Sequence, residues 1–444
     1  MNLTGKNISF RNQNNKSNPN RVLVLLALLI AVAFILQAQN QGRIVSPFAP
    51  TPIPTRSSES YRMEAETHFY SGAINKAIKV YQSGIAIDPE NAQLYAELAR
   101  IQTYSSNLLT TDIQKRERLQ EALDNINKAV ELDENSSMAH AVRAFVLDWY
   151  SNPIISGVES AEYLAEAFTE SQIATELDNT NTLALAYYAE ILADEQKLNA
   201  AELTIREALA QDQGIMDVHR IHALILESQG LYGDAIDAYE RAVEITPSLT
   251  FLYIQIGVNY RQLREYDTAL EYFAKAAKIN ENLEIKDPIP YLAIGKTYSQ
   301  TGDFFIASLN MQKALNFDPT NPDIFASVGI TYFKNRNYEG AIPALKCAVY
   351  GCTAEESCEV RQCDPETDVM APVSGVALSD TTSVYYYTYG SVLAAMHRDV
   401  NGHCEEAMKV LKEVDEVYFD DEIIHPIVTE SQEICFSYGY TIPQ

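Results

Sequence analysis

The sequence MDVHRIHALILESQGLYGDAIDAYERAVEITPSL, residues 216–249, contains two short amphipathic helical patterns separated by a turn. In its second half, residues at three- and four-residue steps share one helical face: Tyr232, Ala235, Ile236, Tyr239, Ala242 and Val243. Gly230 ends the first helix because glycine readily adopts the left-handed conformation that follows helix ends, and Pro247 ends the second. Neither helix buries its apolar face alone, so the unit needs neighbouring copies of itself.

Copies of this unit follow at intervals of about thirty-four residues. Their small and aromatic positions are Gly257, Tyr260, Tyr266, Ala269, Phe273 and Ala276, then Gly295, Tyr298, Gly302, Ala307, Met311, Ala314 and Pro319, then Gly329, Tyr332, Tyr338, Ala341, Leu345 and Ala348. Small residues let adjacent helices approach closely, and aromatic residues fill the gaps between units. With this period and pattern the chain resembles the tetratricopeptide repeat family. The resemblance implies an all-α fold, an α-solenoid of about nine helix-turn-helix repeats.

The repeats are predicted to occupy residues 58–350 as units one to eight. Units two and three are each about eleven residues too long, which we assign to a longer second helix near residues 112–130 and to a loop near residues 152–157. Residues 351–382 show no helical period and are predicted to form an irregular, cysteine-containing insert. Residues 383–444 then supply a divergent ninth repeat and a capping helix.

The N-terminus has the pattern of an export signal. Residues 1–21 are polar and basic, and Val22–Leu36 is an unbroken apolar run, so residues 22–38 are predicted to be a signal anchor or a signal peptide. The run spans roughly 22 Å as a helix, against about 30 Å of bilayer hydrocarbon. Cleavage of a signal peptide needs small residues at an A-x-A spacing after the apolar run, and this sequence lacks them there. That favours an uncleaved anchor.

Residues 39–57 are rich in Pro, Ser, Thr and Gln and are predicted to be an extended linker. Because the basic residues precede the apolar run, the N-terminus is expected in the cytoplasm and the repeats on the extracytoplasmic side, at a cell surface or in a periplasm. If the signal is cleaved, the protein is secreted instead. The combination resembles bacterial-type, membrane-anchored tetratricopeptide proteins.

The charge distribution argues against nucleic acid as a partner. The formal net charge is −27, and residues 1–57 hold six basic residues and no acidic one, so the rest of the chain carries −33. Nucleic-acid binding surfaces instead gather Lys and Arg.

All six cysteines lie in the last quarter of the chain. An even number in an exported region predicts three disulfides. Cys404 opens the second helix of the ninth unit and Cys435 lies near the end of the next helix, so antiparallel packing would bring the two together. Cys347, Cys352, Cys358 and Cys363 are then expected to pair among themselves. Zinc is the alternative, but no C-x-x-C pair is present.

No enzymatic motif, cofactor site or metal site is predicted. His219 and His222 share a helical face but lack a third ligand at suitable spacing, and Trp149 is more typical of a core residue than of a ligand site. The sequence contains no glycine-rich phosphate loop, G-x-S-x-G or H-E-x-x-H.

We therefore predict a membrane-tethered scaffold that binds a protein or peptide partner in the concave groove formed by the first helices of the units. The predicted groove residues are Arg220, Leu224, Glu227, Phe251, Ile254, Val258, Arg261, Gln262, Ile289, Leu292, Lys296 and Gln300. The centre of this set is apolar and its neighbours are charged, which suits an amphipathic partner. Two other functions stay open: an accessory or ligand-binding subunit of an envelope enzyme or secretion complex, and a purely structural envelope subunit.

Overall fold

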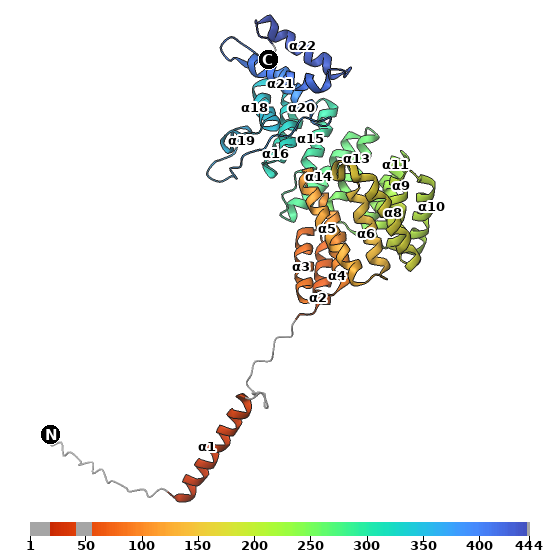
Figure 1. Cartoon of the computed structure of the whole chain (residues 1–444), viewed down its shortest axis with the longest axis vertical. Coiled ribbons are helices and arrows are strands. Elements are labelled where there is room, and N and C mark those ends of the chain that lie inside the picture. The colour runs from red at the N-terminus through yellow and green to blue at the C-terminus, as the bar shows by residue number, and fades with distance from the viewer. Residues whose placement is uncertain (1–17, 41–55, 442–444) are drawn as a thin grey trace, which may run out of the picture. The chain divides into compact units, whose positions relative to one another are not determined.

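The computed structural model describes residues 18–40 and 56–441, and the chain divides into two compact units, residues 1–56 and 57–444. The first unit contains α1 (Pro19–Asn40), and the second contains all later helices (Figure 1). The described residues form helices and turns, with one isolated β-bridge between Cys352 and Val373. The prediction of an all-α fold is confirmed.

Helix α1 is long and apolar enough to cross a membrane, judged by length and composition alone. The apolar part covers the 20 residues Pro19–Ala38, which span about 30 Å at 1.5 Å per residue. The helix thus extends beyond the apolar run at both ends. A signal sequence has the same properties. Most of the predicted basic segment and linker, residues 1–17 and 41–55, lies outside the described residues.

The second unit is a solenoid of nine antiparallel helix pairs followed by α22 (Ile424–Ser437). The pairs are α2 (Ser58–Tyr70) with α3 (Ile74–Ile87), α4 (Ala92–Ser106) with α5 (Asp112–Leu132), α6 (Ser137–Tyr150) with α8 (Ser160–Leu177), α9 (Thr182–Asp194) with α10 (Leu198–Gln211), α11 (Met216–Ser228) with α12 (Tyr232–Ile245), α13 (Thr250–Gln262) with α14 (Tyr266–Asn282), α15 (Ile289–Thr301) with α16 (Phe304–Phe317), α17 (Pro322–Lys334) with α18 (Tyr338–Val349), and α20 (Ser383–Met396) with α21 (His403–Tyr418). This arrangement confirms the predicted number of repeats.

Within four of the pairs, a glycine of the first helix lies against a large side chain of the second. A Cβ at Gly257 would lie 2.4 Å from the Phe273 ring, and one at Gly329 would lie 2.6 Å from Leu345. Gly295 meets Met311 and Gly390 meets Leu411 in the same way. The small residues of the repeat pattern therefore set how closely the two helices of a pair approach.

The two over-long units are lengthened in different ways. In unit two, α5 has 21 residues. In unit three, α7 (Pro153–Ser156) and a 3₁₀ turn (Gly157–Glu159) lie between α6 and α8, and α8 has 18 residues. Helix α7 begins at Pro153, and the side chain of the preceding Asn152 caps it by accepting a hydrogen bond from the Ile154 N–H.

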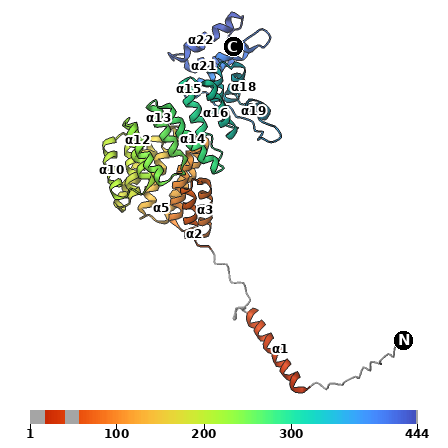
Figure 2. The same ribbon diagram turned by 180° about the vertical axis from the view of Figure 1, so that it is seen from behind.

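The solenoid turns tightly enough for units distant in sequence to touch. Gly72, in the turn between α2 and α3, has a positive φ of 79°, and a Cβ there would lie 2.4 Å from the carbonyl oxygen of Ser248, just before α13. Thr110, between α4 and α5, donates a hydrogen bond to Asp318, which follows α16. Figures 1 and 2 show α2–α5 beside α13 and α14.

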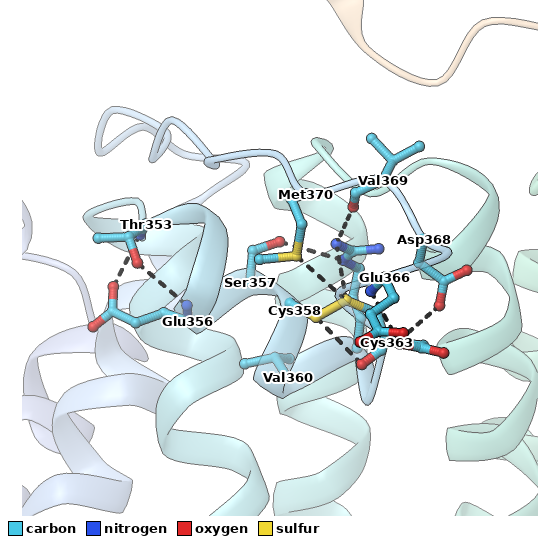
Figure 3. Close-up of a disulfide and its surroundings, with 12 residues drawn as sticks. Thr353, Glu356, Ser357, Cys358, Val360, Cys363, Glu366, Asp368, Val369 and Met370 are labelled. Atoms are coloured by element: carbon cyan, nitrogen blue, oxygen red, sulfur yellow. Dashed lines mark hydrogen bonds between the residues drawn. A yellow bond between two sulfur atoms is a disulfide. The ribbon is translucent and has the colours of Figure 1, made fainter.

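The insert after α18 is more ordered than its composition predicts. It contains α19 (Ala354–Arg361), whose N-terminus is closed by a capping box between Thr353 and Glu356 (Figure 3). Beyond the helix, Arg361 Nη2 donates a 2.6 Å hydrogen bond to the carbonyl of Val369. The expectation of a wholly irregular segment is wrong for these eight residues, because local capping stabilises a helix too short to show a period.

The six cysteines form three pairs. Cys404 on α21 and Cys435 on α22 are bonded, with Cα atoms 5.4 Å apart, which is the pair expected from the sequence. Cys347 pairs with Cys352, with Cα atoms 4.7 Å apart. Cys358 pairs with Cys363, with Cα atoms 5.0 Å apart (Figure 3). The former of these two pairs joins α18 to the insert, and the latter closes α19.

Candidate partner-binding site

The inner face of the solenoid is formed by the first helix of each pair. Side chains of α4, α9 and α11 meet on this face in a cluster that we call the buried network: Arg100, Tyr104, Tyr187, Glu190, Asp217 and Arg220. Tyr104 and Tyr187 have no exposed surface, and Asp217 is 1% exposed. The network joins residues up to 117 positions apart, so it locks non-adjacent repeats together.

Asp217 is the centre of one half of the network. Its carboxylate accepts hydrogen bonds from Tyr187 at 2.7 Å and from Tyr104, and it pairs with Arg100. Burial alone would raise the pKa of Asp217, but the charge of Arg100 and its hydrogen bond hold that pKa below its ordinary value. Asp217 therefore stays ionised inside the fold.

Arg220 is the centre of the other half. Its guanidinium forms two hydrogen bonds with Glu190, at 2.8 and 2.6 Å, and a third with the Tyr104 hydroxyl at 3.1 Å. A two-bond pair of this kind satisfies a buried arginine well. Phe251 of α13 stacks on Tyr104 with ring centroids 5.5 Å apart, which extends the closed region to α13.

Beyond Phe251 the inner face opens into a cavity of about 380 Å³, which we call the basic cavity. Six of the predicted groove residues line it: Ile254, Val258 and Arg261 of α13, and Ile289, Leu292 and Lys296 of α15. Further lining residues come from α17, Tyr385 of α20, and the segment between α4 and α5 with the first turn of α5. The structure thus gathers half of the predicted set in one hollow.

The basic cavity holds positive charge that protein groups leave uncompensated. Lys296 keeps solvent-accessible surface, but the protein atoms of the hollow displace part of the water around its ammonium group; this burial, and then repulsion from Arg261 and Lys115, lowers the pKa of Lys296. Burial also lowers the pKa of Arg261, whose Nη1 has no hydrogen-bond partner among the described residues. The one carboxylate in the lining, Asp323, accepts a 3.1 Å hydrogen bond from Tyr385, and burial raises its pKa.

The other predicted groove residues lie elsewhere. Leu224, Glu227 and Phe251 line a second cavity of about 570 Å³, which we call the acidic cavity. Arg220 also borders it, but its charge is already matched by Glu190. Gln262 and Gln300 are exposed and line neither cavity.

Sequence reasoning missed the far wall of the basic cavity. Leu109, Thr110 and Lys115 precede α13 by about 140 residues, and only the closing of the superhelix brings them opposite Ile254 and Leu292. The extra length of unit two was the one feature of the sequence that could have indicated this wall, because a longer connection can reach across the superhelix.

The two histidines noted in the sequence lie apart from both cavities. His219 Nε2 is 2.9 Å from the carbonyl oxygen of Gln213, and His222 lies 4.0 Å from Glu202. Burial lowers the pKa of His222. In the described part of the chain, no group of three or more His, Cys, Asp or Glu side chains is placed to hold a metal ion.

Sequence models of the tetratricopeptide repeat match residues 189–250 and 252–283. The chain carries tetratricopeptide repeats. It is 31% identical over 119 residues to the BBSome complex member BBS4 of Bos taurus, covering 26% of this chain and 22% of that protein. It is 22% identical over 111 residues to anaphase-promoting complex subunit 3 of Schizosaccharomyces pombe, covering 25% of this chain and 16% of that one. The chain therefore spans less than a quarter of these two relatives.

Two solved structures are similar at low identity. One is a tetratricopeptide repeat protein from Parabacteroides merdae, with 16% identity, a TM-score of 0.37, and coverage of 62% of this chain and 98% of that one. Another is the human IFIT1 dimer with PPP-AAAA, with 16% identity, a TM-score of 0.48, and coverage of 88% and 92%. The repeats indicate a protein–protein interaction scaffold.

Proposed function

We propose that this protein is a non-enzymatic scaffold, tethered to a membrane by α1 with its solenoid on the extracytoplasmic side. The solenoid binds an acidic, amphipathic segment of a partner protein in the basic cavity. Apolar side chains of that segment contact Ile254, Val258 and Leu292, and its carboxylates pair with Arg261 and Lys296.

The observation that carries this proposal is the combination of apolar side chains with uncompensated cations in one hollow of the inner face. Positive groups at a concave surface attract acidic partners and set their orientation, while buried apolar contacts supply most of the affinity. The overall charge of the second unit is strongly negative, so a local basic hollow within it discriminates sharply among partners.

The tether and the compartment rest on separate observations. An apolar helix of about 30 Å matches a bilayer, the basic residues before it favour a cytoplasmic N-terminus, and six paired cysteines favour an oxidising compartment. Protease digestion of sealed membrane vesicles tests the orientation. We expect residues 57–444 to be digested only from the extracytoplasmic side, and digestion from the cytoplasmic side would contradict the proposal.

The binding site is tested by photo-crosslinking in native membranes. A benzoylphenylalanine placed at Lys296, which is exposed, should crosslink the partner, whereas one placed at Leu203, 72% exposed on α10, should not. Mass spectrometry of the adduct should identify a segment with several acidic residues. Equal crosslinking from both positions, or a crosslinked segment without acidic residues, would contradict the proposed site.

A charge variant separates binding from folding. Lys296→Glu should weaken capture of the crosslinked partner about tenfold or more, because the reversed charge repels an acidic segment. Its circular dichroism should match that of the unsubstituted protein. The matched control is Lys278→Glu, because Lys278 is an exposed lysine on the outer helix α14. Capture that survives Lys296→Glu would place the site elsewhere.

A further inference from the structure

The acidic cavity is enclosed mainly by the inner helices α6, α9, α11 and α13 and by α7 and its connections. Its volume of about 570 Å³ is in the range of small-molecule sites. Four carboxyl groups border it: Asp148, Glu190, Asp194 and Glu227. One cation, Arg220, faces them, so the cavity carries an excess of acid.

Two of the four carboxyl groups are satisfied by protein donors. Glu190 pairs with Arg220 and also accepts a 3.2 Å hydrogen bond from the Trp149 indole. Glu227 accepts a hydrogen bond from the Tyr239 hydroxyl at 2.9 Å and another from Asn259. The other two, Asp148 and Asp194, share a side-chain hydrogen bond with each other.

Asp148 lines the cavity while being 4% exposed, and its Oδ1 has no hydrogen-bond partner in the described structure. A buried oxygen of this kind is costly unless something donates to it. Asp194, on the neighbouring inner helix α9, is solvent-accessible and hydrogen-bonds to Asp148, so one of these two carboxyl groups carries the shared proton.

The surroundings of this pair disfavour two negative charges. Burial, and then repulsion from Asp194 and Glu190, raises the pKa of Asp148. Burial, and then repulsion from Glu190, raises the pKa of Asp194 to about 6. A cationic ligand would relieve the repulsion and supply the missing donor.

The remaining walls suit an alkyl chain. Trp149, Leu164, Leu224 and Phe251 contribute apolar surface, and Trp149 presents an aromatic system that attracts cations. An ammonium group has three N–H donors and no acceptor, so it matches a pair of carboxyl groups without leaving a group unsatisfied. A chain of methylene groups behind it would cover the apolar wall.

We propose that the acidic cavity binds an alkylammonium group, held between Asp148 and Asp194 with its carbon chain along Trp149 and Leu224. The group belongs to a free alkylamine or to a lysine side chain of a bound protein. This site shares only Asn107 with the lining of the basic cavity and does not depend on the proposed partner.

The test is isothermal titration calorimetry of the full chain in detergent micelles. The probes are pentylamine, as a free amine, and N-acetyl-lysine methylamide, as a lysine side chain; pentanol and N-acetyl-norleucine methylamide are their uncharged counterparts. We expect at least one charged probe to bind about tenfold or more tightly than its counterpart, because a hydrogen bond to a charged group is strong. The probe that binds better identifies the source of the ammonium group.

Two variants locate the site. Asp194→Asn and Asp148→Asn should each weaken binding of the charged probe about tenfold, and Asp399→Asn, in the exposed turn before α21, should leave it unchanged. Because Asp194 is at the surface, its variant should fold even if the Asp148 variant does not.

The pH dependence gives an independent readout. The groups facing Asp194 are Asp148 from α6, Glu190 from α9 and Arg220 from α11. Since the cation needs an ionised carboxylate, affinity should rise from about pH 5 to about pH 8 and should flatten in Asp194→Asn. Absence of binding by both charged probes, equal binding of charged and uncharged probes, or unchanged affinity in Asp194→Asn would overturn the proposal.

Discussion

The inner faces of α4–α11 and of α13–α15 come from equivalent positions of the same repeat. They differ in whether their arginine and lysine side chains are paired with carboxylates. In the first region Arg100 and Arg220 are each matched by a buried carboxylate, and their network closes the face where it lies, beside the acidic cavity. In the second region neither Arg261 nor Lys296 pairs with a carboxylate of the described residues, and the face is hollow. Matched charges thus let side chains of non-adjacent repeats pack together, whereas unmatched charges at the basic cavity are available to a charged partner.

The largest expected effect is on the closed region. Asp217→Asn should lower the free energy of unfolding by about 3–5 kcal/mol, because it leaves the charge of Arg100 without its buried counter-ion. Urea denaturation of the full chain in detergent measures this effect. The control is Glu244→Gln, which breaks the exposed Arg241–Glu244 pair and should leave the transition unchanged. Equal transitions for the two variants would show that the network does not hold the repeats together.

The closed region also has an expected pH dependence. The pKa of Asp217 in the folded protein is below its value in the unfolded chain, so its stabilising contribution is present above about pH 4 and disappears as pH falls further. The difference in unfolding free energy between the unsubstituted protein and Asp217→Asn should therefore shrink below about pH 4. A difference that stays constant down to about pH 2 would contradict the ionised state of Asp217.

A smaller effect tests the packing that both regions share. Gly257→Ala should destabilise the protein by about 1–3 kcal/mol, because the new Cβ would lie 2.4 Å from Phe273. Gly233→Ala is the control, since nothing lies within 4 Å of its added Cβ, and it should stabilise by about 0.5–1 kcal/mol through helix propensity. Changes of the same sign for both variants would contradict the close contact.

The smallest effect is expected in the open region. Lys296→Gln should change the free energy of unfolding by less than about 0.5 kcal/mol, because the side chain is exposed and faces only like charges among the groups that shift its pKa. Thermal denaturation measures the change. A loss comparable to that of Asp217→Asn would mean that the basic cavity is part of the structural core, and the contrast between the two regions would fail.

The sequence predicted the contacts that recur with the repeat. Gly257 with Phe273 and Gly329 with Leu345 lie one helix hairpin apart, and their spacing made the solenoid recognisable. The same period placed Ile254 and Leu292 on the inner face, where they line one cavity. Cys404 and Cys435 were paired from the antiparallel order of consecutive helices.

The contacts across the superhelix could not be predicted in this way. Tyr104 meets Asp217 at a separation of 113 residues, which depends on the small rotation added by each repeat. Arg220 was predicted to line the groove because of its position in the repeat. In the structure it lies in the buried network, for the same reason. The repeat period did not predict the pairing of Asp148 with Asp194, because these residues lie near the ends of α6 and α9.

The contrast between a closed and an open inner face is tested most directly by hydroxyl-radical footprinting of the full chain in detergent. Four tyrosines in three environments provide matched reporters: Tyr104 and Tyr187 in the buried network, Tyr385 in the basic cavity, and Tyr70, 45% exposed. The account predicts that Tyr104 and Tyr187 are protected, that Tyr385 reacts at an intermediate rate, and that Tyr70 reacts fastest. Oxidation of Tyr104 and Tyr187 as fast as that of Tyr70 would contradict a closed inner face.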